Sequence, residues 1–260
     1  MCFGNWRNYM SASRPKVIVV LPAYNAEKTI ARTVADIPRQ VVDEIILVDD
    51  ASRDKTAEIA EQLGLTVIRH PENRGYGANQ KTCYDAARQH GADIVVMVHP
   101  DYQYDPRIIP YLIGFIKEDI CDVVLGNRIR TRQEALSGGM PRWRYFVNRF
   151  SSALENFLFG QNLGEWHSGL RAYSRKVLET IPYHFNTDDF AFDQQFLIQC
   201  VYSGFRLGDV PVKARYFPEA SSINFWRTIK YGWQTLLAIG GYYLKKWLGL
   251  PIKIFSRLNE

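Results

Sequence analysis

The chain has 260 residues, of which 47% are hydrophobic and 23% are charged, and its formal net charge is +5. These values are typical of globular proteins and exclude a disordered or fibrous chain. The mild positive charge favours an anionic partner such as a nucleotide, a lipid phosphate or an acidic membrane surface, whereas dispersed basic residues without a DNA- or RNA-binding signature argue against nucleic acid.

Strands and helices are expected to alternate through the first half of the chain. Such alternation predicts an α/β fold whose mostly parallel central sheet carries helices on both faces and binds ligands at the carboxyl ends of its strands. The expected strands are Val17–Leu21, Glu44–Val48, Thr66–Arg69, Asp93–Val98 and Asp122–Leu125, and the expected helices are Ala26–Asp36, Asp54–Leu63, Asn79–His90 and Pro106–Lys117.

The second half is expected to be less regular. Its pattern predicts a mobile loop at Arg130–Gly139, helices at Arg142–Phe159 and Phe190–Tyr202, a strand at His167–Tyr173, an extended segment at Phe205–Tyr216 and a long helix at Ser222–Trp247. We therefore expect a flexible N-terminal segment over residues 1–14, one α/β domain over residues 15–218, and an amphipathic, aromatic and basic helical extension over residues 219–260.

Polar residues follow the first two expected strands. The first strand ends in Pro22, Ala23, Tyr24, Asn25, Ala26 and Glu27, and the second in Asp49 and Asp50, followed by Ala-Ser-Arg-Asp-Lys-Thr. Adjacent carboxylates suit ribose hydroxyls or a base N–H, and a tyrosine ring suits the face of a base. A purely structural role as helix cap explains Asp54 but not the pair before it.

The fourth strand is followed by His99, Asp101 and Gln103, which point to one side if the segment is extended. Imidazole, carboxylate and carboxamide groups together can bind a divalent cation. The alternative is an ordinary strand-to-helix turn in which Asp105 caps a helix that starts at Pro106, and that turn leaves His99 and Asp101 unexplained.

Taken in order, these segments resemble the family 2 glycosyltransferases, which have the Rossmann-like GT-A fold. The resemblance is carried by Pro-Ala-Tyr-Asn-Ala-Glu, Val-Asp-Asp-Ala-Ser-Arg-Asp-Lys-Thr, His-Pro-Glu-Asn-Arg-Gly-Tyr-Gly-Ala-Asn, Gly-Asn-Arg and Ser-Gly-Leu-Arg-Ala-Tyr, and it extends over about Lys16–Tyr216. Within that family, the chain is most similar to the group of dolichyl-phosphate mannosyltransferases and polyprenyl-phosphate glycosyltransferases.

The resemblance implies a set of site residues. Asp101 and Gln103 would bind Mg²⁺ or Mn²⁺ on the donor's diphosphate, and Arg128 would face the acceptor. The donor would contact Pro22, Ala23, Tyr24, Asn25, Glu27, Asp49, Asp50 and Arg74.

The chain departs from the family pattern at two places. Relatives usually have Asp where this chain has His99, and a histidine ligand favours a softer cation such as manganese. Relatives often have a basic residue after a serine that follows Val210–Val212, whereas this chain reads Pro218–Ile223 there. Arg215 or Lys213 is the remaining candidate for the diphosphate.

The implied reaction is inverting transfer of a sugar from a nucleotide-sugar to a polyprenyl phosphate in cell envelope glycan biosynthesis. A phosphate acceptor, positioned by Arg128 with Arg130 or Arg132, needs little deprotonation because its second pKa is about 6. A glycan hydroxyl acceptor needs a general base, for which Asp193 is the candidate, although Asp193 also suits a helix N-terminus.

Two other functions stay open. A nucleotidyltransferase would be expected to have a glycine-rich loop after its first strand, and Pro22–Glu27 contains no glycine. A catalytically silent nucleotide-sugar-binding protein is compatible with the altered residue at His99. Transfer of sugar separates an enzyme from a silent binder.

The location is expected to be cytoplasmic and peripheral on the cytoplasmic face of a membrane. Residues 1–14 lack the apolar core of a signal peptide, and Thr235–Leu244 is shorter than the roughly 20 residues that span a bilayer. The last 40 residues mix basic and aromatic side chains, which suits a membrane interface. Packing on the domain, on a second subunit or on a membrane-protein partner is the alternative.

Overall fold

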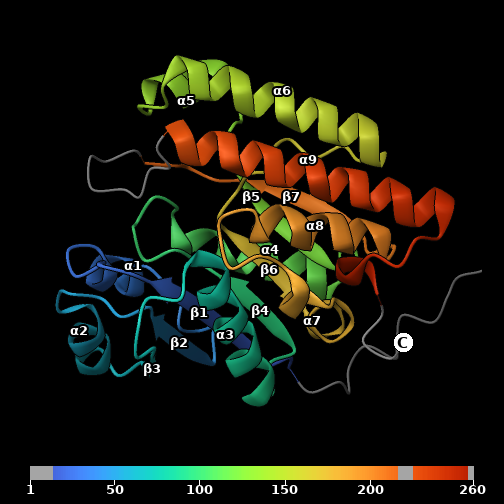
Figure 1. Cartoon of the computed structure of the whole chain (residues 1–260). Coiled ribbons are helices and arrows are strands. Elements are labelled where there is room, and N and C mark those ends of the chain that lie inside the picture. The colour runs from blue at the N-terminus through green and yellow to red at the C-terminus, as the bar shows by residue number, and fades with distance from the viewer. Residues whose placement is uncertain (1–13, 216–224, 257–260) are drawn as a thin grey trace, which may run out of the picture.

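A seven-stranded sheet forms the centre of the molecule, as seen in a computed structural model that describes residues 14–215 and 225–256 (Figure 1). The strand order is β3-β2-β1-β4-β6-β5-β7, and only β6 is antiparallel to its two neighbours. The strands are β1 (Val17–Ala23), β2 (Glu44–Asp49), β3 (Thr66–Arg69), β4 (Ile94–Met97), β5 (Val123–Asn127), β6 (Arg171–Ser174) and β7 (Leu207–Pro211). The mostly parallel sheet that the sequence predicts is therefore confirmed.

Both faces of the sheet are covered, which explains the continuous apolar runs in its central strands. Every residue of β1 is buried, and its side chains alternate between two cores. Val17, Val19 and Leu21 pack with α1 (Ile30–Ala35), α2 (Thr56–Gln62) and α4 (Ile109–Lys117). Ile18 and Val20 pack with α3 (Tyr76–Gln89) and α8 (Phe192–Tyr202).

Two long helices, α6 (Arg142–Phe159) and α9 (Phe225–Leu248), lie side by side above the carboxyl ends of the strands (Figure 1). Tyr242 of α9 packs its ring on Phe159 of α6 at 5.0 Å between centroids, and Tyr243 donates a hydrogen bond to the carbonyl of Leu158. Because Ala238 and Tyr242 also belong to the core beneath, α9 is built into the same body as the sheet.

Some expected elements differ from those observed. The expected loop at Arg130–Gly139 contains α5 (Arg132–Ser137), whose first turn is capped by Thr131. Helix α7 (Arg175–Thr180) was not expected, because six residues are too few to establish a helical period. The strand predicted from His167 begins only at Arg171, and the helix predicted from Pro106 opens with a 3₁₀ turn, Pro106–Ile108.

The proposed domain boundary at residues 218–219 and almost all of segment 1–14 lie outside the described residues. So does the departure at Pro218–Ile223. In the part of the chain that is described, no helix has the length and apolar character needed to cross a bilayer.

Candidate active site

The loops after β1 and β2 are joined to each other by polar contacts. Asn25 donates its amide N–H to Ser52 Oγ at 2.8 Å and accepts from the amide of Arg53 at 2.9 Å. Asn25 and Ala51 both have positive φ, a strained backbone that is concentrated at functional sites. The loops after β1 and β2 therefore both turn sharply where they meet, at the carboxyl ends of their strands.

Further contacts between these loops use the motif residues Glu27, Asp54 and Thr56. The carboxylate of Glu27 accepts from the amide of Lys55, Asp54 accepts from the amides of Glu27 and Thr56, and Thr56 Oγ1 accepts from Ala26. The sequence predicted that Asp54 caps α2; the cap position is instead Lys55, and Asp54, one residue earlier, accepts from the amide of Thr56, the first residue of the helix. Glu27 contributes to loop structure, and a contact with the donor stays a prediction.

The adjacent carboxylates Asp49 and Asp50 have different surroundings although both are buried. Asp50 accepts from the amides of Arg74 and Gly75 at 2.9 and 3.0 Å, and from His70 Nδ1 at 2.7 Å. Asp49 accepts from the amide of Ser52 with one oxygen, while its buried Oδ1 has no partner among the described residues. An orphaned buried oxygen calls for a ligand, so Asp49 is the better placed of the two to receive a nucleoside.

Tyr24 and Arg74 have exposed side chains at the same edge, whereas Pro22 and Ala23 are buried at the end of β1. Tyr24 is 50% exposed, which suits a ring that covers a base. Of Arg74, only the backbone amide has a structural role in these contacts, and its guanidinium lies at the surface.

The segment after β4 is not extended, because Tyr102 has φ of 58°. The prediction that an extended backbone brings the side chains of His99, Asp101 and Gln103 to one side is therefore wrong. The turn nevertheless brings His99, Asp101 and Gln103 to one cavity. The cap role assigned to Asp105 is confirmed, since its carboxylate accepts from the amide of Arg107.

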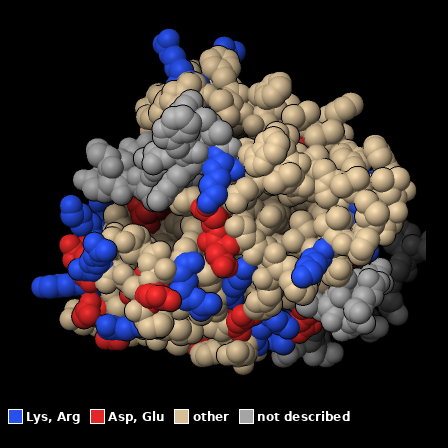
Figure 2. All heavy atoms as spheres, viewed as in Figure 1, with Lys and Arg blue, Asp and Glu red and all other residues tan. Residues whose placement is uncertain are grey.

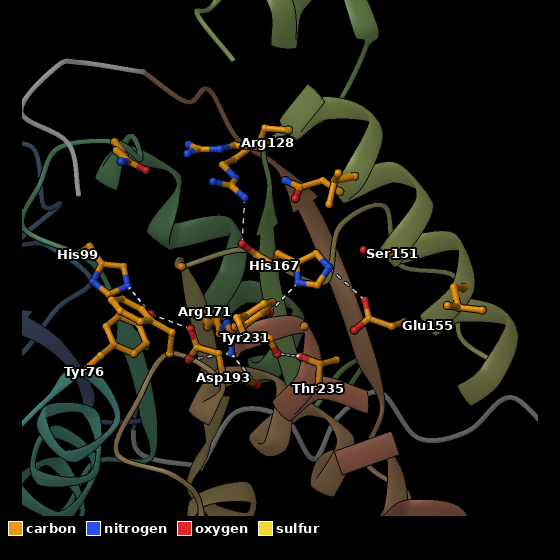
Figure 3. Close-up of a pocket in the computed structure, with 18 of the residues that line it drawn as sticks. Tyr76, His99, Arg128, Ser151, Glu155, His167, Arg171, Asp193, Tyr231 and Thr235 are labelled. Atoms are coloured by element: carbon orange, nitrogen blue, oxygen red, sulfur yellow. Dashed lines mark hydrogen bonds and ion pairs between the residues drawn. The ribbon is translucent and has the colours of Figure 1, made fainter. Parts of the chain in front are cut away.

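The cavity has a volume of about 430 Å³ and lies between the end of β4, α6 and α9 (Figure 3). Its polar side includes His99, Asp101, Gln103, Arg128 and Asp193. Its apolar wall comes from the two long helices and consists of Trp143, Val147, Leu154, Leu236 and Ile239. A cavity with a polar side and an apolar wall suits an amphipathic substrate.

A buried polar network backs the His99 side of the cavity. His99 Nε2 lies 3.0 Å from Tyr76 Oη, which donates to Asp193 Oδ2 at 2.7 Å (Figure 3). Asp193 Oδ1 accepts from Gln80 Nε2 at 3.0 Å and pairs with Arg171 at 3.1 Å. Burial lowers the pKa of His99 and, with Asp193 adding to it, raises the pKa of Tyr76 well above its usual value.

These contacts bear on the expectation that Asp193 acts as a general base. Three donors already engage its two oxygens, namely the Tyr76 hydroxyl, the Gln80 amide and the buried guanidinium of Arg171. The geometry favours Asp193 as a positioning group behind Tyr76.

Arg128 lines the cavity from the end of β5 and is held by the fully buried Glu165. Glu165 accepts from both the backbone amide and the guanidinium of Arg128, and the guanidinium also donates to the carbonyl of His167 at 2.9 Å. The cation is thereby fixed in orientation at the cavity wall.

A second polar group in the cavity was missed by sequence reasoning. His167 Nδ1 lies 2.8 Å from Tyr231 Oη of α9, and His167 Nε2 lies 3.3 Å from the carboxylate of Glu155 of α6 (Figure 3). Arg144 of α6 also lines the cavity. Residues so far apart in sequence, on helices with apolar patterns, give no local signal of a shared site.

Arg215 lies beside the segment that follows β4. Its guanidinium is 4.4 Å from the Tyr102 ring, and its amide donates to the carbonyl of Gln103 at 2.8 Å. Its buried Nη1 has no partner among the described residues. These contacts suit Arg215 as a ligand of the diphosphate, the role for which the sequence offers Arg215 or Lys213.

The donor set at the end of β4 fits a divalent cation only in part. Among the described residues, no group of three or more His, Cys, Asp and Glu side chains could hold a metal. His99, Asp101 and the carboxamide of Gln103 supply an incomplete set, which oxygen atoms of a bound diphosphate can complete.

Comparison with known proteins identifies the family. A family profile described as glycosyl transferase family 2 matches residues 18–182. The chain belongs to this family. The match runs from the second residue of β1 past β6, so it includes the ends of β1, β2 and β4 and Arg128, whereas Asp193 and Arg215 lie outside it. The protein is therefore a glycosyltransferase.

Individual relatives of this glycosyltransferase act on lipid-linked acceptors according to their names. A UDP-N-acetylglucosamine–dolichyl-phosphate N-acetylglucosaminyltransferase from Methanococcus voltae is 29% identical over 77% of this chain and 86% of the relative. A dolichyl-phosphate hexose transferase from Haloferax volcanii is 32% identical over 76% of this chain and 82% of the relative.

Solved structures confirm the fold. A glucosyl-3-phosphoglycerate synthase from Mycobacterium tuberculosis, solved with phosphoglyceric acid, superposes with a TM-score of 0.66 at 21% identity, covering 92% of this chain and 82% of the other. The same synthase has been solved with Mn²⁺ and uridine diphosphate, covering the same shares with a TM-score of 0.65 and 21% identity.

Proposed function

We propose that this glycosyltransferase moves a sugar from a nucleoside-diphosphate sugar to a polyprenyl phosphate, with inversion, at the cytoplasmic face of a membrane. The observation that carries the proposal is the cavity in which His99, Asp101 and Arg128 face an apolar wall made by α6 and α9. The names of the archaeal relatives agree with this substrate class.

The donor is assigned to the edge formed by β1, β2 and β4. Tyr24 would cover the base, and the unpartnered oxygen of Asp49 would accept a hydrogen bond from the nucleoside. Arg215 would meet the diphosphate at the end of β4. Carboxyl ends of parallel strands are the usual ligand site of such sheets.

The acceptor is assigned to the other end of the cavity. Arg128 and Arg144 supply two cationic groups there, beside the apolar wall of Trp143, Val147 and Leu154. A polyprenyl phosphate has this combination of a dianionic head and an apolar chain. Arginine suits the head because its planar donors match phosphate oxygens.

The outer faces of α6 and α9 support membrane contact. The exposed apolar residues of α6 recur at helical spacing on one stripe, and so do those of α9. In the face shown in Figure 2, the region over these helices carries few charged side chains. The stripes consist of residues that do not line the cavity, Phe146, Phe150 and Phe157 on α6 and Trp233, Leu237, Leu244, Trp247 and Leu248 on α9.

Membrane contact of this kind would place the cavity at the bilayer surface. The helices would lie in the interface rather than cross it, with their apolar stripes in the acyl boundary. Lys245 and Lys246 at the end of α9 would attract anionic lipid headgroups. A lipid phosphate could then reach the cavity between α6 and α9.

The reaction would form one bond and break one. An acceptor phosphate oxygen bonds to the anomeric carbon as the bond from that carbon to the donor diphosphate breaks, and the nucleoside diphosphate leaves. The acceptor needs no base, because its second pKa is about 6. A divalent cation, when bound, neutralises charge that develops on the leaving diphosphate. Asp101, Gln103 and His99 would hold that cation, and Arg128 would orient the acceptor.

The test is transfer from a panel of nucleotide sugars to a short polyprenyl phosphate, with Mg²⁺ or Mn²⁺, for wild type and Asp101→Ala. We expect metal-dependent transfer that falls at least about a hundredfold in Asp101→Ala. Asp119→Ala, at an exposed acid far from the cavity, serves as the control. Hydrolysis of the donor without lipid glycosylation would reject a polyprenyl phosphate as the acceptor. Nucleotide binding without any turnover would reject the proposal that the protein catalyses this transfer.

A further inference from the structure

The hydroxyl of Tyr76 lies between His99 and the carboxylate of Asp193. It is 3.0 Å from His99 Nε2 and 2.7 Å from Asp193 Oδ2. Arg171 and Gln80 direct their donors at Asp193 Oδ1, and Asp193 Oδ2 accepts the hydrogen bond from the Tyr76 hydroxyl. The single proton of the Tyr76 hydroxyl therefore points to Asp193.

This arrangement determines which nitrogen of His99 carries the proton. Since the Tyr76 proton is engaged by Asp193, only a lone pair of Tyr76 Oη faces His99 Nε2, and Nε2 must donate. In neutral imidazole, the form that binds metals, one nitrogen is a donor and the other has a free lone pair. The network thus selects the Nε2–H tautomer and leaves the lone pair on Nδ1.

The ring of His99 is also fixed in orientation. A Cβ atom at Gly169 would lie 2.6 Å from His99 Cδ2 and 3.0 Å from Nε2, so this edge of the ring is packed against the Gly169 backbone. Tyr76 stacks on the imidazole with 5.5 Å between centroids, and Phe190 packs on Tyr76 at 4.9 Å. Nδ1 is on the opposite edge and makes no hydrogen bond to a described residue.

We propose that Tyr76 is a positioning residue whose hydroxyl, anchored by Asp193, fixes His99 with Nδ1 presented as a nitrogen ligand for the divalent cation. The site consequently selects Mn²⁺ over Mg²⁺, because imidazole suits transition metals whereas Mg²⁺ prefers oxygen ligands. The inference rests on the proposed function for the cation's role, but its test does not depend on sugar transfer.

The test uses Mn²⁺ with UDP or GDP as the probe and electron paramagnetic resonance as the readout. The wild-type spectrum should contain ¹⁴N coupling from one directly bound imidazole. Labelling histidine with ¹⁵N should replace this coupling by ¹⁵N coupling, which assigns the ligand without changing an amino acid. His99→Asp should remove the coupling and reduce the preference for Mn²⁺ over Mg²⁺. Tyr76→Phe should weaken Mn²⁺ binding at least about tenfold, the effect of losing an outer-shell partner of a metal ligand.

Tyr183→Phe is the matched control, because it deletes a tyrosine hydroxyl that also donates to a carboxylate, that of Asp85, but lies outside the cavity. We expect its Mn²⁺ affinity to equal that of wild type. Absence of ¹⁴N coupling in the wild type, or unchanged Mn²⁺ affinity in Tyr76→Phe, would overturn the inference. Lipid glycosylation without ¹⁴N coupling would reject this inference alone, and ¹⁴N coupling without lipid glycosylation would reject the proposed acceptor alone.

Discussion

Arg128 illustrates at the residue scale how a charge can be kept ready at a cavity wall. Its guanidinium is only 11% exposed, and its counter-ion Glu165 is fully buried. Glu165 also accepts from the backbone amide of Arg128, so it fixes both the side chain and the end of β5. Removing one partner of such a pair leaves an uncompensated buried charge.

We therefore expect Glu165→Gln to lower the free energy of unfolding by about 3 kcal/mol. Glu134→Gln provides the control, because Arg130–Glu134 is an exposed pair four residues apart in sequence and contributes less than about 1 kcal/mol. Urea unfolding of the two variants measures the difference. Equal losses would mean that the buried pair has no special structural role.

At this scale, the sequence could identify which segments form the site but could not assign each side chain. Asp49 and Asp50 look equivalent in sequence, yet only Asp49 has a buried oxygen without a partner among the described residues. The difference comes from the loop containing His70 and Arg74, which folds over Asp50. Long-range contacts of this kind leave no local pattern.

At the element scale, the helices α6 and α9 are unusual because each turns a stripe of apolar side chains toward solvent. Polar side chains of both helices, among them Glu155 and Tyr231, line the cavity beside apolar ones, while Phe150 and Phe157 are 72% and 84% exposed. Exposed apolar stripes of this size mark an interaction surface. Sequence periodicity predicted the helices, but it could not tell which face is turned outward.

We expect Phe150→Glu to weaken binding to liposomes at least about tenfold, because an aromatic side chain gains roughly 1.5–3 kcal/mol on burial. Thermal stability should hardly change, since the residue is exposed in the free protein. Tyr111→Glu is the control, as Tyr111 is 63% exposed on α4, on the opposite face of the sheet. Liposome co-sedimentation gives the comparison, and equal binding by both variants would refute a membrane role for α6.

The bounds of long helices and strands were predicted well from the sequence, whereas short helices were not. The expected helix Arg142–Phe159 has the observed bounds, and long patterned strands such as β1 and β2 are within two residues of the expected ones. The pattern predicts a loop in place of α5 and no helix at α7, and both helices have only six residues. Two turns or fewer do not display a period, so tertiary packing decides their structure.

At the scale of the whole molecule, the site draws on elements spread over most of the chain, from Tyr24 after β1 to Tyr231 in α9. Ligands that bind only the folded chain must therefore stabilise it as a whole. The family and the GT-A sheet were predictable because the strand-end motifs are local. The joining of α9 to the sheet was not, because it depends on packing between distant segments.

We expect Mn²⁺ with the correct nucleoside diphosphate, at about one hundred times the dissociation constant, to add about 2.7 kcal/mol of stability. For a domain of this size, that raises the melting temperature by about 5–10 °C. Differential scanning calorimetry with and without EDTA is the measurement, and Asp101→Ala should lose the metal-dependent part. A shift that survives EDTA unchanged would show that the cation does not contribute to nucleotide binding.

The antiparallel strand β6 has a consequence for how this enzyme family can diversify. β6 pairs with both β4 and β5, so a segment that follows the cavity-lining helix α6 returns to the middle of the sheet. Exchanging everything after residue 128 between relatives would therefore replace a central strand along with the two helices that line the cavity. Recombination at that point breaks the hydrophobic core, and we expect new acceptor preferences to arise by point substitution in α6 and α9 rather than by inheritance of whole cassettes.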